Sequence, residues 1–132
     1  MDSCIKGIHH AALKCCGMGE YEKTVAFYRD VLKLPVKRSW GEGVKSGIML
    51  DTGAGLIEIF ASGESRLETG SIRHFAFSVS DTDAVAEAVR RAGYAITDEP
   101  HDIVIPSEIP FPARIAFCIG PVGEEIEIFQ EK

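Results

Sequence analysis

Hydrophobic and polar positions along this chain follow one pattern that occurs twice. Residues 8–14, IHHAALK, and residues 72–78, IRHFAFS, share isoleucine, histidine, alanine, an apolar residue and a polar residue at the same spacing. The four residues IEIF occur at 57–60 and again at 126–129. Because both matches occur in the same order at similar offsets, they indicate an internal duplication.

The same pattern predicts the secondary structure of each half. Period-two alternation predicts strands over 8–14 and 72–78. Apolar residues at helical spacing predict a helix over 20–33, and Asp81 is a plausible N-cap for a second helix that stops at Gly93. Three strand segments are expected after each helix, at about 36–40, 45–51 and 55–61, and at about 95–97, 113–119 and 124–130.

Each half therefore reads β-α-β-β-β, which predicts an α+β fold. One half has a single helix and one apolar sheet face, too little for a comfortable core. Two halves packed side by side would form a curved mixed sheet, a cup with its helices outside. We expect one domain over 1–132, with module one at about 5–62, a polar linker at about 63–71 and module two at about 72–131.

Composition and charge exclude several classes of function. The chain has 132 residues, of which 45% are hydrophobic and 26% charged, and its formal net charge is −6. Nucleic-acid binding needs a positive footprint, and the basic residues here are scattered. The sequence contains no apolar run long enough for a membrane span and no signal-peptide core. We expect a cytoplasmic protein without nucleic-acid or membrane partners.

The four cysteines are expected to be reduced. Cys15 and Cys16 are adjacent, which strains a mutual disulfide, and no CxxC spacing is present. With Gly17 they look like an insertion before the first helix.

Strand alternation identifies the candidate metal ligands. Isoleucines 57, 59, 126 and 128 favour the helix-covered side of each sheet, so the intervening glutamates point the other way. Repeat symmetry places two histidines on the same side. Two carboxylates in a partly apolar cavity repel each other and lose hydration, and one divalent cation would resolve both difficulties. The candidate ligands are His10, Glu58, His74 and Glu127.

Two neighbouring residues are interpreted differently. His9 falls on the opposite face by alternation and is taken as structural. Glu125 shares the Glu127 face but lies nearer the turn, and is taken as a solvated rim charge. The donor set of imidazoles and carboxylates suits Ni²⁺, Zn²⁺, Co²⁺, Mn²⁺ or Fe²⁺.

These stretches resemble the vicinal oxygen chelate superfamily (glyoxalase, bleomycin resistance and dioxygenase proteins). The resemblance rests on IHHAALK, VAFYRDVLKLP, GLIEIFAS, IRHFAFSV and GPVGEEIEIF, and covers nearly the whole chain. The His/Glu/His/Glu quartet is similar to that of glyoxalase I, the lactoylglutathione lyase. The resemblance implies one divalent metal per site, nickel or zinc before cobalt, manganese or iron, held by the four candidate ligands.

The resemblance also implies a reaction, the detoxification of methylglyoxal. A small-molecule hemithioacetal of a 2-oxoaldehyde and a thiol would be isomerised to an S-2-hydroxyacyl thioester through a metal-bound enediolate. Glu127 is assigned as the base, with Glu58 assisting or serving the other face. A homodimer is expected, with the site built within one chain or across the dimer.

Two other functions stay open at this point. Relatives with glutamine at the Glu58 position resemble methylmalonyl-CoA epimerase, a metal-dependent enzyme with related enolate chemistry. Relatives that only bind bleomycin or similar drugs commonly lack the metal quartet, and would be non-catalytic binding modules.

Substrate contacts are the third expectation. Lys14 occupies a position where glyoxalase I proteins usually carry an arginine, so it could bind a substrate carboxylate. Arg114 is placed near the mouth of the cup as a second substrate-binding candidate, against the alternative of a surface ion pair. The proline-rich segment 101–112 is read as a loop at this mouth. Trp40 and Phe60 are weighed as pocket walls or as core.

Overall fold

The protein consists of two compact units, Met1–Arg66 and Leu67–Lys132. The structure, a computed structural model, describes residues 4, 6–65, 70 and 72–132, so the predicted linker and the predicted start of module one at Ile5 lie partly outside it. Each unit has the predicted β-α-β-β-β order, and its four strands form one open mixed sheet. The shared cup stays a prediction, because the two units are described separately.

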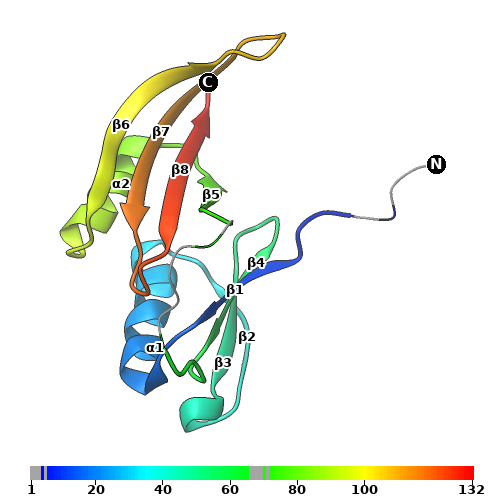
Figure 1. The fold of residues 1–132 in the computed structure, drawn as a ribbon, viewed down its shortest axis with the longest axis vertical. Helices are drawn as coiled ribbons and strands as arrows, with labels where there is room; N and C mark the ends of the chain where they lie inside the picture. The colour runs from blue at the N-terminus through cyan, green and yellow to red at the C-terminus, as the bar shows by residue number, and fades with distance from the viewer. Residues whose placement is uncertain (1–3, 5, 66–69, 71) are drawn as a thin grey trace. The chain divides into compact units, whose positions relative to one another are not determined.

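Unit 1 places its parallel strand at one edge of the sheet. Its strands are β1 (His10–Lys14), β2 (Val36–Trp40), β3 (Gly47–Asp51) and β4 (Leu56–Phe60). They lie in the order β1-β4-β3-β2, with β1 parallel to β4 and the other pairs antiparallel (Figure 1). A short 3-10 turn, η2 (Gly43–Lys45), precedes β3.

The helix of unit 1 begins earlier than predicted. α1 (Gly17–Ala26) continues into a π-helical turn, η1 (Phe27–Val31). The backbone N–H of Cys16 donates a hydrogen bond to the Glu20 carboxylate at 2.9 Å, so this glutamate satisfies an amide that the helix itself leaves unpaired. The predicted insertion at 15–17 therefore includes the first residue of the helix.

Unit 2 repeats this arrangement with longer strands. Its strands are β5 (Phe75–Ser78), β6 (Ile96–Ile105), β7 (Phe111–Ile119) and β8 (Glu125–Glu131), in the order β5-β8-β7-β6. α2 (Thr82–Arg91) packs on β6, β7 and β8 (Figure 1). Neither described helix has the length and apolar content needed to span a bilayer.

The prediction of a short strand at 95–97 and a loop over 101–112 was wrong. β6 runs to Ile105 and pairs with β7 as far as Phe111, so only residues 106–110 connect the two strands. The prediction followed the prolines of segment 101–112, but Pro106 and Pro110 lie in the turn between the strands, and the one proline inside β6 is Pro100. It is tolerated here because β6 is an edge strand.

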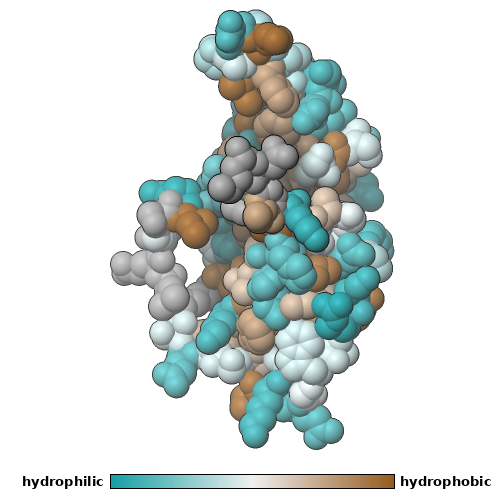
Figure 2. All heavy atoms as spheres, turned by 90° about the vertical axis from the view of Figure 1, so that its right-hand side faces the viewer, coloured by the Kyte–Doolittle hydropathy of each residue, from teal (hydrophilic) through white to brown (hydrophobic). Residues whose placement is uncertain are grey.

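The tip of the β6–β7 hairpin presents apolar side chains to solvent. Val104 is 61% exposed and Ile109 is 83% exposed. Figure 2 shows brown side chains at the upper end of the molecule, where this hairpin turns.

The two IEIF segments fix which face of each sheet is buried. Ile57 and Ile59 of β4 are at most 3% exposed, and Ile126 and Ile128 of β8 are each 1% exposed. Because side chains alternate along a strand, a slip of one residue would exchange these isoleucines for glutamates. The register of both strands is therefore strongly specified.

We expect the replacement Asp81→Ala to destabilise unit 2. The Asp81 carboxylate accepts a hydrogen bond from the backbone N–H of Ala84 at 3.0 Å and caps α2. Loss of such a cap costs about 1 kcal/mol. Urea unfolding followed by circular dichroism should show this loss, and Asp81→Asn, which keeps an acceptor, should unfold close to the wild type. Equal stability of the alanine and asparagine variants would contradict the capping role.

Candidate metal site

Unit 1 brings His10 and Glu58 together on one face of its sheet. Along β1 the side chains of His10, Ala12 and Lys14 are the exposed set. Ala12 lies directly beside Glu58 in the parallel β1–β4 pair. His10 Nε2 lies 3.3 Å from Glu58 Oε1, and the Glu58 side chain is only 10% exposed. A carboxylate with so little hydration needs a polar or charged partner, and His10 is that partner.

Unit 2 forms the equivalent pair from the equivalent positions. His74, just before β5, places its Nε2 atom 3.2 Å from Glu127 Oε1. The Glu127 side chain is 14% exposed. Phe117 lies beside Glu127 in the β7–β8 pair, and its ring meets the His74 ring edge-on at 5.3 Å between centroids. The aromatic ring shields this second pair from solvent on one side.

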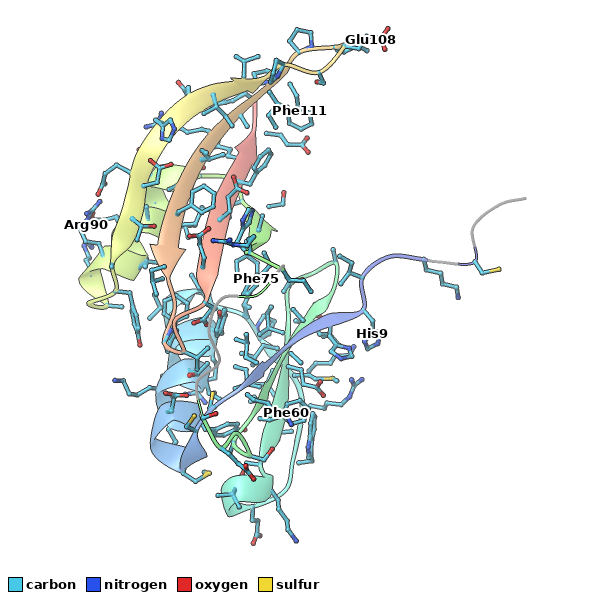
Figure 3. The ribbon with its side chains drawn as sticks, in the orientation of Figure 1. His9, Phe60, Phe75, Arg90, Glu108 and Phe111 are labelled. Atoms are coloured by element: carbon cyan, nitrogen blue, oxygen red, sulfur yellow. The ribbon has the colours of Figure 1, made fainter. Side chains whose placement is uncertain are left out.

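The second nitrogen of each histidine also has a neighbour. His10 Nδ1 lies 2.9 Å from His9 Nδ1, and His74 Nδ1 lies 3.7 Å from a carboxylate oxygen of Glu125. Partners of this kind select which histidine nitrogen carries the proton and so orient the ring. The sequence assigned His9 to the opposite face and Glu125 to the rim. Alternation does not govern His9, because β1 begins only at His10 (Figure 3).

The spacing within each pair fits two ligands of one metal ion. Two donors that each lie about 2.1 Å from an ion are about 3.0 Å apart at a right angle and about 3.4 Å apart at the tetrahedral angle. The separations of 3.3 Å and 3.2 Å match this range. In neither unit do the described residues gather three or more histidine, cysteine or acidic side chains around one point. Each unit therefore brings together one histidine and one glutamate of the predicted quartet, and the joining of the two pairs around one ion stays a prediction.

Lys14 lies on the same face as the His10–Glu58 pair. It is directly beside Phe60 in the β1–β4 register, and Phe60 lies beside Gly47 of β3. The Trp40 ring packs edge-on against Phe60 with 6.1 Å between centroids. The two aromatic residues lie on the ligand face, and Trp40 is 37% exposed, so they form a wall there instead of core.

Arg114 lies on the other face of its sheet. It is three residues from Phe117 along β7, and its guanidinium donates to Asp83 of α2 at 2.6 Å and to Asp102 of β6 at 3.2 Å. The hydrogen bonds that Arg114 donates to Asp83 and then to Asp102 raise the pKa of Arg114, and the bond to Asp83 lowers the pKa of that carboxyl. These contacts give its predicted substrate-binding role no support and match the surface ion pair considered as the alternative.

Arg38 is a residue of the ligand face that the sequence did not reveal. It lies beside Met49 of β3, which in turn lies beside Glu58. A β-bulge between Val36 and Arg38 changes which face β2 presents, and no local sequence signal marks this bulge.

A hollow of about 390 Å³ opens at the edge of unit 1 where the chain enters β1. Lys6, His9, Lys37 and Asp51 are among the residues that line it. Neither His10 nor Glu58 lines this hollow, so it lies beside the candidate site and is not the site itself.

The thiol of Cys118 should be almost inert to alkylation at pH 8. No disulfide joins any of the four cysteines, and burial raises the pKa of Cys118 to about 12. Only about one thiol in ten thousand is then ionised at pH 8, and the thiolate is the reactive form. Peptide mapping after brief iodoacetamide treatment should show modification at the exposed Cys4 and none at Cys118 until denaturant is added. Rapid labelling of Cys118 in the native protein would contradict this burial.

The model of the glyoxalase/bleomycin resistance protein/dioxygenase superfamily matches residues 7–127. The chain is 27% identical over 135 residues to the uncharacterized protein YwkD of Bacillus subtilis, covering 96% of this chain and 98% of YwkD.

Two solved structures share the fold. The genomically encoded fosfomycin resistance protein FosX of Listeria monocytogenes has a TM-score of 0.70 at 17% identity, covering 97% of this chain and 95% of its own. A glyoxalase family protein of Enterococcus faecalis has a TM-score of 0.67 at 23% identity. The match covers 94% of this chain and 97% of the Enterococcus protein. At these identities the likeness shows the architecture alone.

Proposed function

The chain belongs to the glyoxalase/bleomycin resistance protein/dioxygenase superfamily, and we propose that it is a metal-dependent lyase of the glyoxalase I type. One observation carries this proposal: a histidine Nε2 atom lies 3.2–3.3 Å from a glutamate oxygen at the same position of both units. A binding module without a metal has no use for two such pairs. A bound cation would add charge compensation for these poorly hydrated carboxylates beyond their contacts with histidine.

The proposed metal site takes both pairs as its ligands, His10 with Glu58 and His74 with Glu127, from one chain or from two copies in a homodimer. Nickel or zinc suits this set of nitrogen and oxygen donors, with cobalt, manganese or iron as alternatives. The ion, when bound, would supply Lewis-acid stabilisation of negative charge on two neighbouring substrate oxygens. His9 and Glu125 would orient the two imidazoles through their Nδ1 atoms.

The proposed reaction is an isomerisation in which the protein moves one proton. Methylglyoxal and a small thiol combine in solution to a hemithioacetal. A carboxyl oxygen of Glu127 takes the proton from the carbon that bears sulfur, which leaves an enediolate, and a proton then returns to the neighbouring carbon. The product is an S-2-hydroxyacyl thioester, with no net oxidation.

Glu127 suits this task because its side chain is only 14% exposed, so little water competes for its oxygen atoms. Glu58 would assist, or act on the opposite face of the substrate. Lys14, on the same face as Glu58, would bind a carboxylate of the thiol.

We expect the purified protein to retain one divalent ion per set of four ligands. His10→Ala and Glu58→Ala should each weaken retention by at least roughly tenfold, because each removes one of four donors. Metal content after dialysis, measured by atomic emission, tests this. Glu99→Ala is the matched control, since Glu99 pairs with Arg90 at the surface (Figure 3 labels Arg90). Full activity after chelation would end the metal proposal.

We expect Glu127→Gln to abolish proton transfer while the substrate still forms in solution. The assay follows thioester formation from methylglyoxal and glutathione, together with uptake of deuterium from heavy water into the product. Loss of about a hundredfold or more in rate fits removal of a general base. Glu99→Gln should leave the rate unchanged.

If the metal-loaded wild type forms no thioester but epimerises a CoA ester, the epimerase is the correct member of the superfamily. If Glu127→Gln retains the wild-type rate, another group is the base.

A further inference from the structure

Two rows of side chains cross the ligand face of unit 1 in strand register. One row joins Ala12, Glu58, Met49 and Arg38 across β1, β4, β3 and β2. The adjacent row joins Lys14, Phe60, Gly47 and Trp40 across the same strands. Neighbouring strands lie about 4.8 Å apart, so the backbones of Arg38 and Glu58 are roughly 10 Å apart. A molecule that reaches the His10–Glu58 pair can therefore also reach the arginine.

Arg38 differs in its contacts from the arginines of this protein that form ion pairs. Its guanidinium donates to the thioether sulfur of Met49 at 3.0 Å, and sulfur is a weak acceptor. Among the residues that the structure describes, no carboxylate lies within ion-pair distance of Arg38. By contrast, Arg29, Arg90 and Arg114 each pair with an aspartate or glutamate. The planar guanidinium group of Arg38 can therefore bind a carboxylate of another molecule through two parallel hydrogen bonds.

An aromatic wall lies beside this arginine. The indole of Trp40 lies over Gly47, where any side chain would collide with the ring, so glycine makes room for it. The other member of the wall is Phe60 (labelled in Figure 3), whose ring meets Trp40 edge-on. Arg38 and Trp40 are two residues apart on β2, so an apolar group on this wall has a cation next to it.

The corresponding row positions of unit 2 show that this arrangement is not a general property of the fold. The position that matches Arg38 is Asp98, which lies beside Phe117 as Arg38 lies beside Met49. The position that matches Trp40 is His101, and the position that matches Lys14 is Ser78. Both units keep the histidine–glutamate pair and an edge-on aromatic contact, Trp40 with Phe60 in unit 1 and Phe111 with Phe129 in unit 2. What unit 2 lacks is the pair of cations, because Asp98 and Ser78 stand at the positions of Arg38 and Lys14.

We infer that Arg38 binds a carboxylate of the substrate while Trp40 and Phe60 pack against its apolar part, so the substrate class is an organic acid with an apolar group near its carboxylate. This inference rests on the proposed function to the extent that it takes the His10–Glu58 face as the substrate face. It adds Arg38 of β2 as a residue that determines substrate specificity, separate from the four candidate metal ligands.

Tryptophan fluorescence can report binding at this wall, because Trp40 is the one tryptophan of the chain. Metal-free protein, prepared with a chelator, is titrated with benzoate and with benzamide while tryptophan emission is recorded. The two probes share a ring and differ in charge. We expect benzoate to bind roughly tenfold more tightly than benzamide, as expected for a charge-assisted pair with arginine.

Three variants decide the role of Arg38. In Arg38→Gln the preference for benzoate should fall to about one, and in Arg38→Lys it should be intermediate, because the charge stays and the fork is lost. Arg91→Gln, on the exposed side of α2, should keep the full preference. Circular dichroism checks that each variant is folded. If Arg38→Gln does not fold, the role of Arg38 is decided by the benzoate-to-benzamide preference of Arg38→Lys, compared with that of the wild type.

Equal binding of benzoate and benzamide to the wild type, or an undiminished preference in Arg38→Gln, would overturn the inference. Because these titrations contain no metal, they are independent of lyase activity. A protein that prefers benzoate through Arg38 but retains no metal would refute the proposed function alone. A metal-loaded active lyase without this preference would refute the Arg38 inference alone.

Discussion

The face of each sheet that carries the histidine–glutamate pair is set by the burial of two isoleucines on the opposite face. In β4 and again in β8, a glutamate stands between two isoleucines that are almost wholly inaccessible to water. Alternation along the strand then leaves the carboxylate no direction except away from the core. A register slip would bury that carboxylate without a partner, at a cost of several kcal/mol or more. The apolar core and the polar site are thus two consequences of one constraint.

The duplication gives an internal comparison between two copies of the same framework. Both units keep a histidine beside the glutamate and a second group beside the far nitrogen of that histidine. The residues around the pairs differ: unit 1 has Arg38 and Trp40 where unit 2 has Asp98 and His101. The duplication has therefore kept the histidine–glutamate pairs while the side chains around them have diverged.

The sequence predicted more of the fold at the ends of each module than in its middle. The strands that carry IEIF were placed within about a residue or two, because strict alternation and turn residues bound them. Most of β6 was missed because the proline-rich segment 101–112 was read as a loop, whereas its prolines at 106 and 110 lie beyond the end of the strand. Pro100 lies inside β6, where an edge strand tolerates proline. The early start of α1 depends on the Glu20 carboxylate reaching back to the Cys16 amide, a contact that helix propensity does not contain. The sequence left Arg114 between a substrate contact and a surface ion pair, because a charge on a strand does not reveal which acids of a neighbouring helix will meet it.

The sequence by itself determined the β-α-β-β-β repeat, the buried face of β4 and β8, and the two glutamates on the other face. All of these follow from periodicity within short segments and from similarity between halves. Only the tertiary structure decided which side chains surround those glutamates. The bulge in β2 is the clearest case: Val36 pairs with the buried Leu50, yet Arg38, two residues later, pairs with Met49 on the ligand face. An extra residue in one strand reverses its alternation, and its position is set by pairing with a distant strand and not by local sequence.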